Sequence, residues 1–231
     1  MAGPKAMTKT IAIIGAADNF GSGIAYSLAA AGYRVLLADD IGNDDSPCIE
    51  KLAQLLGRIT CKVPEADVNI VFSSREACRE ADIIIPAVSY PEQAAIACTI
   101  REEVTGKIII SPTNPLPGMH DGLVSPPVTS AAEELAGLLP QAKIVKAFNT
   151  ILASHFVTPR VAGQILDVYV AGDDDEAVAT VITLVTDAGF NPLIAGRLSM
   201  SRILEQMMVL LITLSARNIF PGPTGWKVVT P

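Results

Sequence analysis

The chain has few charged, aromatic and histidine residues, and each shortage excludes a class of function. Of its 231 residues 18% are charged and 5% are aromatic, and the 17 Lys and Arg are outnumbered by 24 Asp and Glu, giving a net charge of −7. An acidic chain without a run of Lys or Arg lacks the positive surface that nucleic acids and anionic membranes require. The two histidines, His120 and His155, have no Asp or Ser at a recognisable spacing, so we expect neither a metal site nor a catalytic triad.

Cysteines are also few, and no long apolar run is present. The spacings of the four cysteines are 13, 17 and 20 positions along the chain, at Cys48, Cys61, Cys78 and Cys98. These spacings match neither a zinc site nor a redox pair, and they predict buried thiols in a reducing cytosol. The N-terminus lacks the apolar segment of a signal peptide, and the apolar stretch 207–214 is far shorter than the roughly 20 residues of a membrane span. We therefore expect a cytoplasmic protein with no membrane partner.

Half of the residues are hydrophobic, which is enough to bury a full core and excludes a disordered chain. The first structured segment is an apolar run at 10–14 that stops at Gly15. An Ala- and Leu-rich stretch then ends at Gly32, and a second apolar run follows at 33–38. Strand, glycine turn, helix and strand within about 30 residues are typical of a βαβ unit.

The alternation of strands and helices continues along the chain. We predict further strands at 68–72, 82–85, 107–110, 142–148, 167–171 and 191–195, and helices at 48–58, 74–81, 91–99, 130–138, 173–188 and 201–216, with one more helix just after Asn149. Regular alternation with apolar strands predicts an α/β protein with a doubly wound parallel sheet. We expect an NAD(P)-binding Rossmann fold at 9–149 and a small C-terminal α/β and helical extension at 150–231.

The turn from Gly15 to Gly21 lies where a Rossmann fold holds the pyrophosphate of its cofactor. Asp39 follows Gly15 by 24 positions, near the usual spacing for a carboxylate that binds the adenosine ribose. Together with Asp40 it would repel a 2′-phosphate, which favours NAD over NADP. Asp18 within the turn would either cap the helix or repel the diphosphate. A plain strand–turn–helix without ligand, with residues 39–45 as a solvated acidic loop, remains the alternative.

Four further strings carry a resemblance to a known family. They are ADIIIPAVSY at 81–90, SPTNPL at 111–116, VKAFNT at 145–150 and AGRLSMSRILE at 195–205. With the glycine turn, they resemble the NADP oxidoreductases that depend on the deazaflavin coenzyme F420. The same module is similar to the cytosolic domain of six-transmembrane ferric reductases. The resemblance runs in order from about residue 10 to the end of the chain.

The resemblance implies roles for particular residues. The pyrophosphate would be lined by the glycine turn, namely Gly15, Ala17, Asp18, Asn19, Phe20 and Gly21. Asp39 and Asp40 stand where the family commonly has Ser-Arg, which grips a 2′-phosphate. The nicotinamide end would be lined by Ala87, Val88, Tyr90, Asn114 and the backbone of Ala147. These strings each end a predicted strand, and ligands of open α/β sheets bind beyond the carboxyl ends of the strands.

We therefore expect an oxidoreductase that passes hydride between NAD(P)(H) and a flavin, a deazaflavin or another small acceptor. Hydride transfer between two rings needs no side-chain acid, so no catalytic residue is assigned. The alternatives are a dinucleotide-binding sensor or decayed enzyme without turnover, and an interaction protein that kept only the fold. Lys146 should alternate outward on its strand in a structural role, and the acidic run 173–176 should begin a helix.

The last predicted helix is apolar around nearly its whole circumference from Ile203 to Leu214, more than one core-facing stripe requires. A second buried face favours a two-fold homodimer. Enclosure of this helix by its own chain remains the alternative.

Overall fold

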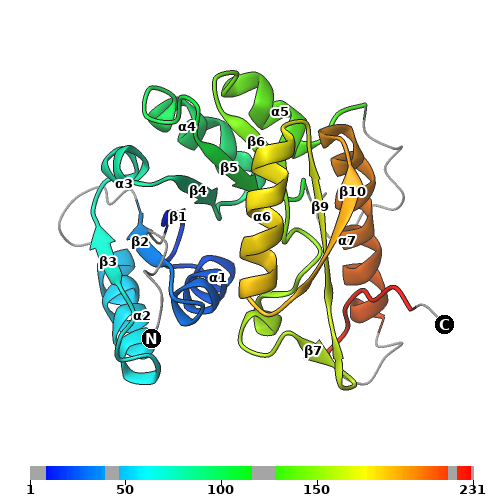
Figure 1. Ribbon diagram of the computed structural model, residues 1–231, viewed down its shortest axis with the longest axis horizontal. Coiled ribbons are helices and arrows are strands. Elements are labelled where there is room, and N and C mark those ends of the chain that lie inside the picture. The colour runs from blue at the N-terminus through cyan, green and yellow to red at the C-terminus, as the bar shows by residue number, and fades with distance from the viewer. Residues whose placement is uncertain (1–8, 40–46, 116–127, 218–222, 230–231) are drawn as a thin grey trace, which may run out of the picture.

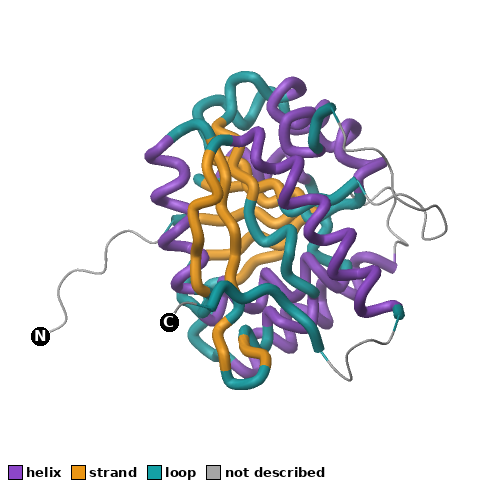
Figure 2. Tube along the Cα trace, turned by 90° about the vertical axis from the view of Figure 1, so that its right-hand side faces the viewer, coloured by secondary structure: helices purple, strands orange, loops and turns teal. Residues whose placement is uncertain are grey.

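The computed structural model describes residues 9–39, 47–115, 128–217 and 223–229. Strands and helices alternate through the first part of the chain, as the sequence predicts, and in chain order they are β1 Thr10–Ile14, α1 Asn19–Ala30, β2 Arg34–Ala38, α2 Pro47–Lys62, β3 Val68–Val71, α3 Ser74–Glu80, β4 Ile83–Pro86, α4 Tyr90–Ile100, β5 Ile108–Ser111, α5 Ala131–Leu138 and β6 Lys143–Lys146. The helices cover both faces of the central sheet (Figures 1 and 2).

The sheet confirms the doubly wound fold. Its first six strands lie in the order β3-β2-β1-β4-β5-β6, and every neighbouring pair among them is parallel. This is the strand order of dinucleotide-binding Rossmann domains, which bind their ligand where the winding reverses, beyond the carboxyl ends of the strands. Here the winding reverses between β1 and β4, so the glycine turn that follows β1 stands at the expected binding edge.

The C-terminal part extends the same sheet. Strand β9 Asp167–Gly172 pairs antiparallel with β6, β10 Asn191–Gly196 pairs parallel with β9, and helices α6 Asp175–Asp187 and α7 Ser201–Ala216 accompany them. The acidic run at 173–176 begins α6 as predicted, with Asp174 as its N-cap. A domain boundary near Asn149 stays a prediction, since the strands on either side of it share one eight-stranded sheet.

The prediction of a helix just after Asn149 is wrong. The chain instead forms a short 3-10 turn, η1 Ala153–Phe156, and a hairpin of β7 Arg160–Val161 with β8 Gln164–Ile165. The two residues between these strands, Ala162 and Gly163, have φ of 49° and 78°. Positive φ at both central positions is the geometry of a tight two-residue hairpin turn, and a right-handed helix cannot continue through residues in that conformation.

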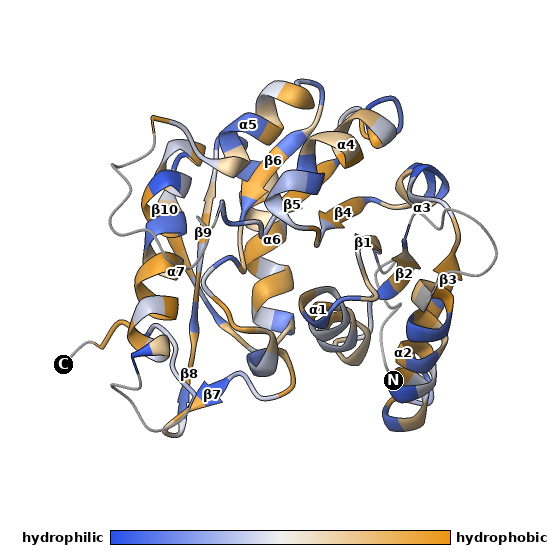
Figure 3. Cartoon of the chain, turned by 180° about the vertical axis from the view of Figure 1, so that it is seen from behind, coloured by the Kyte–Doolittle hydropathy of each residue, from blue (hydrophilic) through white to orange (hydrophobic). Residues whose placement is uncertain are grey.

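The sheet buries apolar side chains on both faces because successive strand residues point in opposite directions. In β1, Ile11 and Ile13 join one core cluster, while Ala12 and Ile14 join the cluster on the other face. Strand β4 is coloured hydrophobic in Figure 3, and all four of its residues are buried. Apolar runs without polar alternation are therefore what this parallel sheet requires.

The cysteine expectation holds only in part. Cys78 is buried and Cys48 is partly buried, but Cys61 and Cys98 are exposed. The exposed pair was predicted wrongly because both lie on helices, α2 and α4, whose outer faces meet solvent. Within the described ranges, no group of three or more His, Cys, Asp and Glu side chains could hold a metal ion.

Helix α7 together with the preceding 3-10 turn, η2 Leu198–Met200, is longer than its apolar core suggests. By length and composition the segment Leu198–Ala216, with 19 residues and a mean hydropathy of 1.3, could cross a membrane. The expectation that the apolar stretch is far too short therefore does not hold by that criterion. The same criterion is met by core helices of soluble proteins, and a third of the segment, 33%, is buried against the rest of the chain.

Candidate functional site

The turn after β1 is built from close backbone approaches. Gly15 has φ of +79°, and a Cβ atom there would lie 2.7 Å from the carbonyl oxygen of Ala87, the residue directly after β4. A Cβ atom on Gly21 would strike the carbonyl oxygen of Gly15 and lie 2.9 Å from the Cα atom of Ala16. Only glycine fits at either position. The chain thus brings the first turn of α1 tightly against the edge where β1 and β4 end, as a bound diphosphate requires.

Asp18 stands at the start of α1 with its side chain exposed. It is the N-cap residue, with φ of −84° and ψ of 162°, and its side chain makes no capping hydrogen bond. Capping was one of its two expected roles, and this geometry contradicts it. The carboxylate therefore adds negative charge at the N-terminus of α1 without occupying the amides of the helix.

Asp39 reaches into the glycine turn from the end of β2. Its Oδ2 atom accepts a hydrogen bond of 3.0 Å from the backbone N–H of Ala17. The acidic residue after β2 and the turn after β1 therefore meet, as the sequence spacing predicts. Asp40, the other residue of the predicted acidic pair, lies outside the described residues.

A groove of about 360 Å³ opens beside this turn, between α1 and α2. It is lined by Ala17, Asp18, Asn19, Ser22, Lys51, Gln54 and Arg58. Lys51 and Arg58 lie on one face of α2 because they are seven positions apart, and both side chains are exposed. Sequence reasoning missed these two cations, although their spacing along a predicted helix was the available signal. They place positive charge next to the glycine turn.

Beyond β4 the structure brings most of the predicted nicotinamide-side residues to the same edge. The Cγ1 atom of Val88 is 3.1 Å from the position of a Cβ atom on Gly15, and Ala87 donates its N–H to Ile14 at 2.8 Å. Tyr90 begins α4, is 37% exposed, and donates its hydroxyl to Glu134 of α5 at 2.8 Å. That hydrogen bond raises the pKa of Tyr90, with burial adding to the effect.

Phe20 is placed differently from the rest of the glycine turn. Its ring meets the ring of Phe156 edge to face, with 5.1 Å between centroids, and it packs against the main core cluster. Asn19 before it is exposed at the start of α1. The aromatic side chain therefore anchors α1 to η1, and only the backbone of Phe20 remains available to line a pyrophosphate.

Asn114 and Asn149 form a reciprocal pair beyond β5 and β6. Asn114 donates its amide to the carbonyl oxygen of Asn149 at 2.9 Å, and Asn149 donates its amide to Oδ1 of Asn114 at 3.0 Å. Ala147 is fully buried, and Phe148 after it has φ of +62°. A non-glycine residue in this conformation costs roughly 1–3 kcal/mol and such strain gathers at functional sites. Sequence reasoning predicted Asn114 and Ala147 here but not Asn149.

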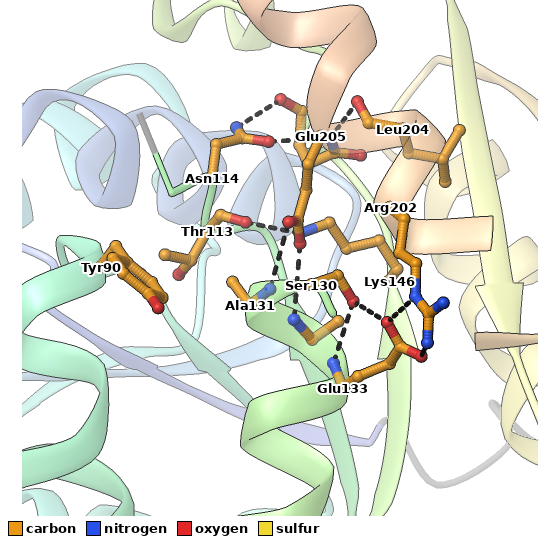
Figure 4. A network of polar contacts seen from close by, with 12 residues as sticks. Tyr90, Thr113, Asn114, Ser130, Ala131, Glu133, Lys146, Arg202, Leu204 and Glu205 are labelled. Carbon is orange, nitrogen blue, oxygen red and sulfur yellow. Dashed lines mark hydrogen bonds and ion pairs between the residues drawn. The ribbon is translucent and has the colours of Figure 1, made fainter. Parts of the chain in front are cut away.

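Lys146 corrects another expectation, since it points into the protein rather than outward. Its side chain is 0% exposed, and Nζ lies 2.6 Å from Oε1 of Glu205, which is itself 1% exposed (Figure 4). Nζ also donates to the carbonyl oxygen of Thr113. Burial lowers the pKa of Lys146 to about 8, against the attraction of Glu205, which raises it. The face of the sheet toward which Lys146 points is covered here by α5 and α7, so outward from the strand is not outward from the protein.

A parallel sheet of this strand order, with a glycine turn at the winding reversal and polar side chains gathered beyond β4, β5 and β6, defines a protein of the Rossmann dinucleotide-binding class. The family model described as NADP oxidoreductase, coenzyme F420-dependent, matches residues 10–115. The resemblance to that family, stated above from sequence motifs, is confirmed.

Similarity to named proteins extends over nearly the whole chain. The F420-dependent NADP reductase of Methanocaldococcus jannaschii is 29% identical over 224 residues, covering 94% of this chain and 97% of that protein. The metalloreductase STEAP3 of Rattus norvegicus is 28% identical over 98% of this chain but only 39% of its own length. A solved structure of a putative F420-dependent NADP reductase from Arthrobacter superposes with a TM-score of 0.75 and 25% identity, covering 90% of this chain and 93% of that one.

Proposed function

We propose that this chain is an oxidoreductase that transfers hydride between NADP(H) and a deazaflavin of the F420 type. The observation that carries the proposal is the close fit of Gly15 and Gly21 between β1, α1 and β4, because it leaves backbone where a diphosphate approaches. The full-length similarity to an F420-dependent NADP reductase supports both substrates. When bound, the nicotinamide ring supplies or accepts the hydride, and the residues of this chain bind and orient it.

The binding roles divide between two ends of the site. At the adenosine and diphosphate end we assign the turn from Gly15 to Gly21 together with Asp39. At the nicotinamide end we assign Ala87, Val88 and Tyr90 beyond β4, Asn114 beyond β5, and the backbone of Ala147 beyond β6. These residues share one edge of the sheet, so a single extended dinucleotide can span them.

The choice between NADP and NAD depends on charges near the adenosine ribose. Asp39 favours NAD, since a carboxylate repels a 2′-phosphate. Lys51 and Arg58 favour NADP, because they place two positive charges in the groove beside the same turn. The reductases to which the chain is similar are named for NADP, and we therefore propose NADP(H) as the preferred cofactor.

The test mixes the purified protein with oxidised F420 and NADPH, and follows the loss of the visible absorbance of the oxidised deazaflavin. Parallel reactions replace NADPH with NADH, and F420 with FMN. Rapid reduction of F420 by NADPH is the expected result. Tight NADPH binding without reduction of any acceptor would instead support a dinucleotide-binding sensor, the alternative function.

We also propose that the protein forms a two-fold homodimer through α7. An apolar stripe, Ile203, Met207, Leu210 and Leu214, follows the outer side of the helix at helical spacing, and Ile203 and Leu210 are 55% and 48% exposed. The opposite side, including Leu204 and Met208, is buried in the chain. An exposed stripe of this kind is typical of a helix that packs against its own copy. A monomeric mass by light scattering at micromolar concentration would contradict the dimer.

We further infer a cytoplasmic location. Cys61 and Cys98 are exposed free thiols, and such thiols persist in a reducing compartment. Fractionation of the native host with detection by antibody tests this inference.

A further inference from the structure

The buried ion pair of Lys146 and Glu205 joins four separate elements beside the nicotinamide end of the site (Figure 4). Lys146 lies at the end of β6 and holds the carbonyl oxygen of Thr113, in the segment that follows β5. Glu205 belongs to α7, and its carboxylate accepts hydrogen bonds from the backbone N–H groups of Ala131 and Ala132 at 3.1 and 3.4 Å. These amides open α5, so the carboxylate also meets the positive end of that helix.

From this pair, short hydrogen-bonded links lead to the side chains assigned to the nicotinamide end. Thr113 directly precedes Asn114, which pairs with Asn149. Asn149 in turn donates to the carbonyl oxygen of Leu204, the neighbour of Glu205 on α7, at 2.9 Å. Asn114 is therefore held from two sides by contacts that begin on α7. The strained backbone of Phe148, with φ of +62°, lies between Lys146 and Asn149.

A second link leads through α5 to Tyr90. The first turn of α5 is bound by Glu205, and its Glu134 accepts the hydroxyl of Tyr90 at 2.8 Å. Gln93 of α4 donates to the carbonyl oxygen of Ala131 at 2.9 Å. Helix α5 therefore connects the buried ion pair to Tyr90 at the start of α4.

Stability alone is a weak reason for this pair to exist. Removing two charges from water costs more than their attraction commonly returns, and apolar replacements of buried ion pairs are often neutral or stabilising. The lowered pKa of Lys146 agrees, since it shows that burial outweighs the attraction of Glu205. Fixed geometry is the property that an apolar pair at these positions could not supply, because apolar contacts do not specify which carbonyl and amide groups meet.

We propose that Lys146 and Glu205 are positioning residues for hydride transfer, which hold Asn114 and Tyr90 in place around the nicotinamide end without touching substrate. This inference rests on the proposed function for its activity readout. It assigns to α7 a direct part in shaping the site, in addition to its exposed stripe. The expected signature is a loss of turnover that is separate from any loss of fold or of cofactor affinity.

The experiment compares the wild type with Lys146→Met, Glu205→Gln and the double variant Lys146→Met/Glu205→Leu. Each single variant leaves one charged or polar partner buried, so some loss of stability is expected. The double variant removes both charges and should therefore regain part of the thermal midpoint that the single variants lose. Its midpoint should stay below that of the wild type, because the amides of Ala131 and Ala132 lose their acceptor. We expect its single-turnover rate of hydride transfer to stay at least about tenfold below that of the wild type. Its dissociation constant for NADPH should stay within about twofold of the wild-type value.

The matched control is Lys227→Met, which breaks the ion pair of Lys227 with the buried Asp167, 2.7 Å apart. Asp167 begins β9, and its hydrogen-bond partners, Asn191, Lys227 and Val228, lie outside the network of Lys146 and Glu205. This control should lose stability but keep the wild-type rate of hydride transfer. A double variant that regains both stability and rate would overturn the inference, because the pair would then be structural only.

A separate readout keeps the inference testable if the wild type transfers no hydride, a result that would refute the proposed function instead. Hydrogen–deuterium exchange at residues 113–115 and 131–135 reports the order of the two linked segments. Faster exchange there in the double variant, with wild-type exchange in β1 and β2, supports the positioning role. Unchanged exchange in both segments overturns it.

Discussion

Asp39 carries a negative charge that should weaken the binding of NADPH, and Asp39→Asn removes that charge while keeping an oxygen for the N–H of Ala17. A 2′-phosphate carries about −1.5 to −2 charges near neutral pH. At about 5 Å in a water-like dielectric, each pair of unit charges repels by roughly 0.8 kcal/mol. The substitution should therefore strengthen the binding free energy of NADPH by about 1.2 to 1.7 kcal/mol, which is roughly tenfold in affinity.

NADH should respond much less to the same change, because it has no 2′-phosphate and asparagine can still accept a ribose hydroxyl. The assay is calorimetric titration of both cofactors into wild type and variant, at low and at high salt. The gain in NADPH affinity should shrink at high salt, since Asp39 is partly exposed and salt screens its charge.

Lys51→Met is the matched control of opposite sign. It removes a positive charge from the groove beside the turn. It should weaken the binding of NADPH while leaving the affinity for NADH nearly unchanged. If Asp39→Asn leaves the ratio of the two affinities within about twofold of wild type, the 2′-phosphate does not lie near Asp39, and the assignment of the adenosine end is wrong.

Three further predictions concern the glycine turn and the pH dependence of folding. Asp18→Gly should tighten NADPH binding by roughly 1 kcal/mol in titrations, because it removes an exposed charge at the N-terminus of α1. Gly21→Ala should destabilise the fold by about 1–3 kcal/mol in urea through overpacking, whereas Gly137→Ala, which has open space around it, should stabilise it by about 0.5–1 kcal/mol. Burial would raise the pKa of Asp167, but hydrogen bonds from Lys227 and neighbouring groups outweigh burial and lower it. The free energy of unfolding should therefore fall as the pH drops from about 4 through the pKa of Asp167 in the folded protein. The dependence of the unfolding free energy on pH should be weaker in Asp167→Asn.

The part of the site that lies close to one strand end could be predicted from sequence. Gly15 and Gly21 are recognisable because only glycine permits positive φ or close backbone contact, and a strand and a helix flank them. Asp39 is recognisable because the helix between β1 and β2 fixes its distance along the chain. In both cases the relevant geometry spans one βαβ unit, so local spacing carries the information.

The buried polar network could not be predicted in the same way. Lys146 and Glu205 are 59 positions apart, and Asn114 and Asn149 are 35 apart. Their contacts depend on which helices cover the end of β6, and periodicity within one strand says nothing of this. The available signal was one charged residue within each of two shorter apolar stretches, Lys146 in 144–148 and Glu205 in 203–214. A buried charge needs a partner, so two isolated charges of opposite sign in apolar surroundings predict each other.

The two sides of helix α7 have different roles: the inner side supports the site, and the outer side forms the interface of the dimer that we propose. Leu204 and Glu205 face inward and hold Asn149 and the first turn of α5. Leu210 and the rest of the outer stripe face a second copy in the dimer that we propose. A rigid helix transmits a displacement of one side to the other, so packing of the stripe against a partner should limit the movement of Glu205. The nicotinamide end would then be ordered most fully in the assembled protein, whereas the adenosine end, built from α1, β2 and α2, would be independent of assembly.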